Sequence, residues 1–230
     1  MMKFYVSTAD KYVHLIKPFS FLFNRFWSED QEVVVLGYKA PDFELPHNFS
    51  FVSMGKSENN PSEWSNGLID YFSSIDDEWF IYATEDMFVV HPVDFQSLEK
   101  LKEYTKDPKV GRIGLTNDVC RKTCFNVTDN VVEMTQDSQY RISCITSMWN
   151  REYMLKHLKR NMTPWEFEVN GTSASHNDGY RILGLNSDFA VRMCLAIRRG
   201  NFDSLDFKFD NEDRSLDESV INEMKDKGII

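Results

Sequence analysis

The residues with the clearest potential for chemistry are two adjacent carboxylates, Glu85 and Asp86. They directly follow Glu78-Trp-Phe-Ile-Tyr-Ala83, the most hydrophobic strand candidate in the chain. Neighbouring carboxylates repel one another unless a cation or a hydrogen-bond donor compensates their charge, and hard divalent cations prefer carboxylate oxygens as ligands. The pair therefore predicts a site for a divalent cation, such as Mn²⁺ or Mg²⁺, or for another ligand. The other acidic pair, Asp76-Asp77, precedes the strand, where we expect a turn or a helix end.

Further polar and aromatic residues follow other strand candidates. Thr8 and Asp10 come at the end of the run from Lys3 to Ala9, and Tyr38 ends the run that begins at Glu32. In an open α/β sheet, ligands bind beyond the carboxyl ends of the strands. An aspartate there can accept hydrogen bonds from a ribose or a base, and an aromatic ring can cover a base. We therefore expect Thr8, Asp10 and Tyr38 to hold a nucleoside, with Trp64 as a weaker candidate nearby.

The elements that must position these residues alternate along the chain. Apolar runs rich in β-branched and aromatic residues predict strands, and apolar residues at helical spacing predict helices. The expected strands are residues 3–9, 32–38, 49–55, 78–83, 109–115 and 142–149, and the expected helices are residues 12–27, 62–75, 94–104 and 151–159. We expect residues 170–178 to form a loop over the site, and residues 117–140 to form a small hairpin or excursion. This alternation indicates a doubly wound α/β layer.

Size and charge limit the classes of function. The chain has 230 residues, 42% of them hydrophobic, which is near the size of one α/β domain. Its net charge of −10 argues against broad binding to nucleic acid or to an anionic membrane, because both need a cationic surface. No apolar run approaches the roughly 20 residues that cross a bilayer, and none resembles a secretory signal. We expect a cytoplasmic protein without a transmembrane segment, whose four cysteines are reduced thiols.

The C-terminal residues differ from the rest in charge. Residues 201–230 hold nine acidic and four basic side chains, which supply about half of the net charge. We expect residues 1–200 to form the domain, and residues 201–230 to form an acidic, solvated extension. Ser215 and Glu218 have the spacing of a capping box, so a helix through Ile221 and Met224 is expected in this extension.

Four stretches of the sequence carry a resemblance to known proteins. They are Trp79-Phe-Ile-Tyr-Ala-Thr-Glu-Asp-Met-Phe88, Pro92-Val-Asp94, Ser147-Met-Trp-Asn-Arg-Glu-Tyr-Met-Leu155 and Thr163-Pro-Trp-Glu-Phe-Glu168. Through them, residues 1–190 look like small GT-A glycosyltransferases of bacterial surface-polysaccharide loci and large DNA viruses. The resemblance implies an α/β, GT-A-like single domain with a mostly parallel central sheet flanked by helices, built to use nucleotide-diphospho-sugars in polysaccharide biosynthesis.

The resemblance also implies roles for individual residues. The acidic motif after a central strand of such enzymes binds the metal and the donor diphosphate, which corresponds here to Asp86, helped by Glu85. A tryptophan followed by acids lies near the acceptor and often includes the catalytic base, which corresponds to Glu166 and Glu168. We take Glu168 as the first candidate for the base and Glu166 as the second, with Asp178 and Asp188 next.

The sequence departs from the family pattern at one position. The usual Asp-X-Asp triplet reads Thr84-Glu85-Asp86 here, so its first aspartate is missing and strict metal dependence is in question. A non-catalytic glycan- or protein-binding module on the same scaffold is therefore the main alternative. A metal-dependent nucleotidyltransferase is a weaker one, because Ser7–Lys11 has no glycine and a single lysine with which to grip a triphosphate.

The function that the sequence favours is glycosyl transfer of hexosyltransferase type. The donor would be a UDP- or GDP-linked sugar and the acceptor a glycan hydroxyl. A single displacement would invert the anomeric carbon, and retention of its configuration is the alternative outcome. No glycine-rich dinucleotide motif, phosphate loop or Gly-X-Ser-X-Gly motif occurs, so the strongest signals for Rossmann cofactors, P-loop kinases and serine hydrolases are absent.

Overall fold

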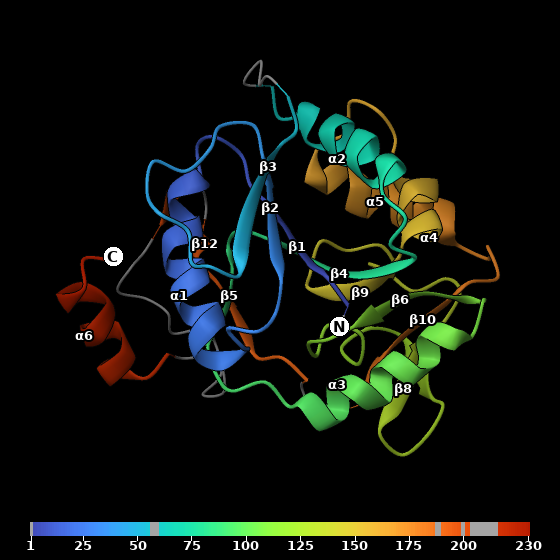
Figure 1. Cartoon of the computed structure of the whole chain (residues 1–230). Helices are drawn as coiled ribbons and strands as arrows, with labels where there is room; N and C mark the ends of the chain where they lie inside the picture. Colours follow the sequence, from blue (N-terminus) through green and yellow to red (C-terminus); the bar gives the residue numbers. More distant parts are fainter. Residues whose placement is uncertain (1, 56–59, 187–189, 199–200, 203–215) are drawn as a thin grey trace.

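A computed structural model describes residues 2–55, 60–186, 190–198, 201–202 and 216–230 (Figure 1). Within these residues, nine strands form one mixed sheet that runs through the middle of the molecule. Their order across the sheet is β3 (Phe49–Ser53), β2 (Val33–Gly37), β1 (Phe4–Ser7), β4 (Trp79–Thr84), β9 (Ser147–Asn150), β6 (Val110–Gly114), β10 (Arg181–Leu185), β8 (Val131–Met134) and β7 (Cys124–Asn126).

Most strands of this sheet point the same way. Strands β3, β2, β1 and β4 pair in parallel, as do β6 and β10. Strand β9 runs against both β4 and β6, and β8 runs against both β10 and β7. The carboxyl ends of β1, β2, β4 and β6 therefore lie at one edge of the sheet, which confirms the predicted α/β architecture with a mostly parallel central sheet.

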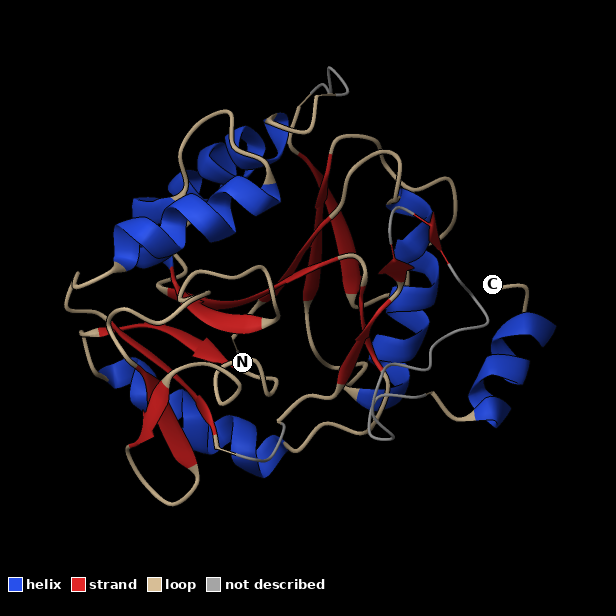
Figure 2. Ribbon diagram, turned by 180° about the vertical axis from the view of Figure 1, so that it is seen from behind, coloured by secondary structure: helices blue, strands red, loops and turns tan. Residues whose placement is uncertain are grey.

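Helices cover both faces of the sheet (Figures 1 and 2). Alternate residues of β1 point to opposite sides, so Phe4 and Val6 join one apolar cluster and Tyr5 joins the other. The first cluster includes side chains from α1 (Ile16–Phe26), α3 (Phe95–Lys102) and α6 (Glu218–Asp226), and the second includes side chains from α2 (Glu63–Ser74), α4 (Arg151–His157) and α5 (Pro164–Ser175). Burial on both faces explains why these strands read as unbroken apolar runs.

Short elements complete the fold around one edge. Strand β5 (Met87–Val89) follows β4 after two residues and pairs antiparallel with β11 (Met193–Leu195). The 3₁₀ turns η1 (Val13–Leu15) and η2 (Glu103–Lys106) precede α1 and follow α3, and β12 (Ile197–Arg198) pairs with β13 (Asn201–Phe202). The connection between β4 and β5 consists of Glu85 and Asp86, so paired strands fix the acidic pair on both sides.

The predicted loop over residues 170–178 is wrong for most of its length, because α5 continues to Ser175. Low helix propensity is shared by Asn170, Gly171, Thr172 and Ser173. A prediction from propensity alone therefore misses this part of the helix. Two structural features override that propensity. Thr163 and Glu166 form a capping box that starts the helix, and Gly171 lies so close to Ile142 that a Cβ there would meet the isoleucine side chain at 3.0 Å.

Two further expectations need correction. The expected strand over residues 142–149 is shorter, because β9 begins at Ser147 and residues 142–146 form a loop. Strand β10 has no counterpart among the expected strands, although it pairs with both β6 and β8. The expected small hairpin within residues 117–140 is confirmed as β7 and β8.

The C-terminal helix α6 packs against α1 and is not a solvated tail element (Figure 1). Val220 and Met224 are buried in the first apolar cluster, Arg25 pairs with Glu223 at 2.6 Å, and Lys17 donates to the carbonyl oxygen of Gly228 at 2.8 Å. Asp217 caps the helix by accepting from the backbone N–H of Ser219, whereas Ser215 lies outside the described residues. The helix was predicted, but its burial was not.

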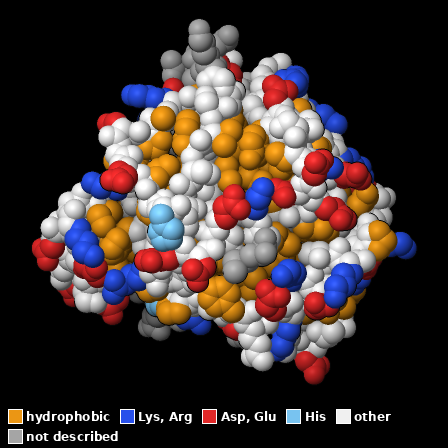
Figure 3. Space-filling model, in the orientation of Figure 1, with side chains coloured by type: hydrophobic (Ala, Val, Ile, Leu, Met, Phe, Trp, Pro, Cys, Tyr) orange, Lys and Arg blue, Asp and Glu red, His pale blue; other side chains and the backbone are white. Residues whose placement is uncertain are grey.

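The surface carries charges of both signs. On the face drawn in Figure 3, lysines and arginines are interspersed with aspartates and glutamates, and apolar patches lie between them. All four cysteines lie within the described residues, and none of them forms a disulfide. Within the described residues, no helix is both long and apolar enough to span a membrane.

Candidate functional site

A cleft of about 820 Å³ opens at the carboxyl edge of the sheet. It brings together the predicted metal-binding pair, Glu85 and Asp86, and the predicted base, Glu168. The other described residues that line it are Tyr12, Thr84, Met87, Asp118, Lys122, Tyr140, Ser143, Cys144, Ile145, Pro164, Trp165, Leu195 and Ile197. Two acidic motifs that are about 80 residues apart in the sequence thus line the same cleft.

The surroundings of Glu85 and Asp86 disfavour the ionised form of both carboxyl groups. Glu85 is only 8% exposed, and burial together with the neighbouring Asp86 raises its pKa to about 8. Burial also raises the pKa of Asp86, although the hydroxyl of Thr84 donates to its Oδ1 at 2.7 Å and opposes that shift. Two adjacent carboxylates with raised pKa values, one buried and one partly buried, are the arrangement that a bound cation would stabilise in the ionised form.

The donor set fits a cation whose remaining ligands come from elsewhere. Within the described residues, no cluster of three or more His, Cys, Asp or Glu side chains is arranged to hold a metal ion. Mg²⁺ is commonly bound through one or two carboxylates together with water and substrate phosphates. Asp86, with Glu85 beside it, fits that mode of binding, and Thr84 takes the place of a third carboxylate as a hydrogen-bond donor to Asp86.

The two candidate bases lie on the first turns of α5, but only one faces the cleft. The Oε1 atom of Glu168 accepts from the backbone N–H of Cys144 at 2.7 Å and from the hydroxyl of Ser143 at 3.0 Å. Among the described residues, its Oε2 atom has no hydrogen-bond donor, so this oxygen remains available to a ligand. Glu166 is exposed and outside the cleft lining, and the hydrogen bonds from Thr163 in the capping box lower its pKa.

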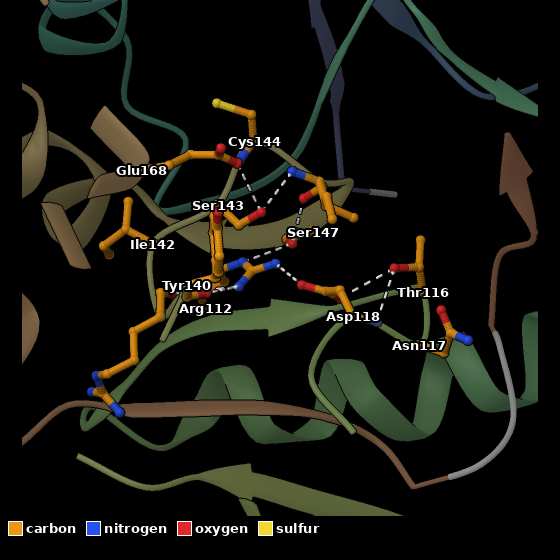
Figure 4. A network of polar contacts seen from close by, with 12 residues as sticks. Arg112, Thr116, Asn117, Asp118, Tyr140, Ile142, Ser143, Cys144, Ser147 and Glu168 are labelled. Atoms are coloured by element: carbon orange, nitrogen blue, oxygen red, sulfur yellow. Dashed lines mark hydrogen bonds and ion pairs between the residues drawn. The ribbon is translucent and has the colours of Figure 1, made fainter. Parts of the chain in front are cut away.

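A buried arginine, Arg112, stabilises the loop that contains Ser143 and Cys144, the hydrogen-bond partners of Glu168 (Figure 4). Arg112 on β6 is fully buried, forms an ion pair with Asp118 and donates to the hydroxyl of Ser147 at 2.9 Å. It also reaches the carbonyl oxygens of Tyr140 and Arg141, both at 3.4 Å. One side chain thus connects the two segments that form this wall of the cleft, residues 116–122 and 140–147.

We expect Arg112→Met to lower the free energy of unfolding by about 3–5 kcal/mol, because removing one partner of a buried pair leaves Asp118 uncompensated. Urea denaturation followed by circular dichroism measures this loss. In Arg112→Met/Asp118→Leu no buried charge remains unpaired, so we expect this double variant to lose less stability than the two single variants combined. Additive losses would contradict coupling between the two side chains.

Several residues of the cleft escaped the sequence analysis. Asp118 follows strand β6. Ligands bind beyond the carboxyl ends of the strands, so the argument that selected residues after β1, β2 and β4 also applies to Asp118. Tyr12, Lys122, Tyr140 and Cys144 carry no local signal of this kind. Cys144 lies near three carboxylates, and burial followed by the charge of Glu168 raises the pKa of its thiol well above the usual range, so the thiol stays protonated.

The predicted nucleoside-binding residues lie at the same edge of the sheet but outside the cleft lining. Asp10 accepts from the backbone N–H of Lys39 at 2.9 Å, which connects the loops after β1 and β2. Thr8 is buried, and the hydroxyl of Tyr38 donates to the carbonyl oxygen of Glu63 at 2.7 Å. Trp64 packs on Phe167 of α5 with ring centroids 5.5 Å apart, so it contributes to the contact between α2 and α5.

Asp178, a further candidate for the base, is held in a separate buried network. Its carboxylate lies 3.5 Å from Arg141, 3.1 Å from Lys156 and 3.5 Å from His157. It does not line the cleft, and Arg141 and Lys156 are the cations that balance its charge. Asp188 lies outside the described residues. The structure thus places Asp178 beneath α4, away from Glu168.

The buried His157 predicts a dependence of stability on pH. Burial lowers its pKa from 6.5 to about 4, so between these values the unfolded chain binds more protons than the folded chain. We expect this histidine to cost the protein about 2 kcal/mol of unfolding free energy between pH 7 and pH 4.5. His157→Gln removes the titrating group, so its stability should fall less over this range in urea denaturation. His47→Gln, at an exposed position, is the matched control and should behave as the wild type.

Comparison with known proteins gives relatives by structure alone. No protein-family model matches the sequence, and no curated protein matches it. Residues 1–349 of TarS from S. aureus superpose with a TM-score of 0.52 at 14% sequence identity, covering 82% of this chain and 59% of that chain. The same protein has been crystallised with UDP, and that structure superposes with a TM-score of 0.51.

A second structural neighbour is a mannosyltransferase. The mannosyltransferase PcManGT from Pyrobaculum calidifontis, in complex with GDP-Man and Mn²⁺, superposes with a TM-score of 0.50 at 14% identity, covering 86% of this chain and 58% of that chain. The present chain thus spans less than two thirds of either protein. These likenesses show that the chain has the fold of small GT-A glycosyltransferases, as its resemblance to them implied.

Proposed function

We propose that the protein transfers a sugar from a nucleoside-diphosphate sugar to a hydroxyl of a glycan acceptor, with the help of a divalent cation. The observation that carries this proposal is the shared cleft, which is lined both by the acidic pair and by a separate, positioned carboxylate on a GT-A fold. The ligands of two proteins with this fold, UDP for TarS and GDP-Man with Mn²⁺ for PcManGT, support the donor class.

The donor would lie along the carboxyl edge of the sheet. Asp10, Thr8 and Tyr38 would contact the nucleoside, and the diphosphate would reach the turn between β4 and β5. Asp86 would hold Mn²⁺ or Mg²⁺ through Oδ2, because Thr84 occupies Oδ1, and Glu85 would assist. A cation bound there supplies Lewis-acid stabilisation of the negative charge on the departing diphosphate.

The acceptor would approach from the side of α5. Oε2 of Glu168 would take the proton of the attacking hydroxyl while that oxygen bonds to the anomeric carbon. The bond from the anomeric carbon to the diphosphate breaks in the same step, which inverts the configuration. Ser143 and the N–H of Cys144 orient the carboxylate for this transfer. Trp165, which lies on α5 like Glu168, is 72% exposed. Its ring suits the apolar face of a sugar.

Calorimetry with a panel of UDP- and GDP-linked sugars tests the donor assignment. We expect at least one of them to bind in the presence of Mn²⁺ and to raise the melting temperature, because a ligand that binds only the native state stabilises it. Asp10→Ala should weaken binding. Asp30→Ala, an exposed aspartate before β2 and thus at the opposite edge of the sheet, is the control and should bind normally. No heat and no thermal shift across the panel at millimolar concentration would refute the donor assignment.

One observation favours a second function, the binding of a glycan without catalysis. The first acidic position of the usual metal triplet is occupied by Thr84, whose hydroxyl is bound to Asp86. A glycan-binding module without catalysis would tolerate that change. Tight binding of a glycan without turnover of any donor would favour this alternative.

A further inference from the structure

Lys122 is the only lysine or arginine among the described residues that line the cleft. The other charged residues of the lining are Glu85, Asp86, Asp118 and Glu168. No carboxylate of the described residues forms an ion pair with Lys122, and Asp118 is paired with Arg112. An ammonium that has no carboxylate partner among the described residues can bind an anionic group of a ligand by charge-assisted hydrogen bonds.

The backbone that carries Lys122 is anchored. Val119 is fully buried and packs where Gly114 and Gly184 leave room, since a Cβ on either glycine would approach the valine within 2.7 Å. Asp118 is held by the buried Arg112, and the backbone N–H of Lys122 donates to the carbonyl oxygen of Val119 at 3.0 Å. The loop therefore presents Lys122 from a fixed position.

Tyr140 positions the side chain of Lys122. The ammonium lies over the Tyr140 ring, 4.5 Å from its centroid, in the geometry of a cation–π contact. Tyr140 has a φ of 57°, which is uncommon for a residue other than glycine, and its carbonyl oxygen accepts from Arg112 at 3.4 Å. Figure 4 shows Arg112 between Tyr140 and Asp118. A strained backbone at the wall of a cleft, held by a buried arginine, is typical of a functional position.

The location of Lys122 favours the acceptor over the donor diphosphate. The diphosphate is assigned to the turn after β4, whereas Lys122 belongs to the segment after β6, and β9 separates these two strands in the sheet. Lys122 and Tyr140 line the cleft together with Ser143 and Cys144, the partners of Glu168. The cation thus lies on the wall that presents the proposed base.

We propose that Lys122, positioned by Tyr140, binds an anionic substituent of the acceptor, so that the acceptor is an acidic glycan. The substituent is a carboxylate, as in a uronic acid, or a phosphate ester; both offer oxygens to the three N–H groups of the ammonium. This inference deepens the proposed function and rests on it, because it takes the cleft to be the place where acceptor and donor meet.

Paired glycans test the inference. The purified full chain, with Mn²⁺ and the nucleoside diphosphate that it binds, is applied to a glycan array whose members differ only in one group. The array compares uronic acids with their neutral hexoses, and phosphorylated glycans with unphosphorylated ones. We expect the wild type to bind acidic members about 10- to 100-fold more tightly, the range of a hydrogen bond to a charged group. The two kinds of pair show whether the group is a carboxylate or a phosphate.

Variants assign the preference to the two residues. Lys122→Met should abolish it without changing the affinity for the nucleoside diphosphate, whereas Lys122→Arg should keep most of it. Tyr140→Phe should keep it and Tyr140→Leu should reduce it, since only the aromatic ring positions the ammonium. Lys100→Met, on the exposed face of α3, is the control and should bind as the wild type does.

Three results would overturn the inference. They are equal binding of neutral and acidic glycans by the wild type, no binding of any acidic glycan, and a loss of nucleotide affinity in Lys122→Met that matches the loss of anion preference. The last result would make Lys122 a ligand of the diphosphate. If no nucleotide binds to the wild type but Lys122→Met still removes a preference for acidic glycans, the proposed function fails and the anion site stands.

Discussion

Glu168→Gln is expected to lower kcat by about 10²–10⁴-fold, the usual contribution of a positioned general base. The amide keeps an oxygen that can accept from Ser143 and from the N–H of Cys144, so the side chain should stay in place. It loses the ability to take the proton of the acceptor hydroxyl. Steady-state release of the nucleoside diphosphate measures kcat, and donor hydrolysis to free sugar serves until the acceptor is known. Donor affinity should barely change.

Glu166→Gln is the matched control for this loss. Its carboxylate accepts from the backbone and hydroxyl of Thr163, so the change should affect the start of α5 and leave kcat within about threefold of the wild type. A large loss in Glu166→Gln with normal turnover in Glu168→Gln would exchange the two roles. Normal turnover in both variants would place the base elsewhere. Asp178 is then a poor substitute, because it lies against Arg141 and Lys156.

Asp86→Asn is expected to lower kcat/KM by about 10²–10³-fold, as the loss of a group that stabilises transition-state charge does. It should also remove the increase in donor affinity that Mn²⁺ brings. The asparagine can still accept from Thr84, so the turn between β4 and β5 should keep its shape. Calorimetry of the donor with Mn²⁺ and with excess chelator measures the change, and Glu85→Gln should have the milder effect.

The control for Asp86 lies at the other end of the same strand. Asp76→Asn changes an exposed aspartate before β4 and should leave both donor affinity and its dependence on Mn²⁺ unaltered. Equal donor affinity with Mn²⁺ and with chelator in the wild type, together with unchanged binding in Asp86→Asn, would assign the acidic pair a structural role. The raised pKa of Glu85 would then reflect burial without a ligand.

The parts of the fold that the sequence predicted are those with strong local patterns. Strands β1, β2 and β4 are buried on both faces, so their residues read as apolar runs whose ends are visible in the sequence. The residues at their carboxyl ends could be ranked because all parallel strands present those ends at one edge. This reasoning placed Glu85 and Asp86 at that edge, where the structure has them in the lining of the cleft.

The parts that the sequence did not predict depend on contacts between distant segments. Helix α5 forms against the propensity of its residues because Gly171 packs on Ile142 and Thr163 caps its first turn. Strand β10 gains its stability from pairing with β6 and β8 on either side. Lys122 and Tyr140 meet only in the folded chain, and no local pattern marks either of them. The sequence therefore did not predict the wall of the cleft that Lys122 and Tyr140 help to form.

The position of Mn²⁺ in the folded protein tests the central claim most directly. Crystals of the protein soaked with Mn²⁺ and UDP or GDP give an anomalous difference map in which the metal is identified by its own anomalous scattering. The account predicts one strong peak within coordinating distance of the Asp86 carboxylate, with the diphosphate bound to the same ion and Glu168 across the cleft. A nucleotide and metal bound elsewhere, or a well-ordered nucleotide in this cleft with no metal at Asp86, would contradict it.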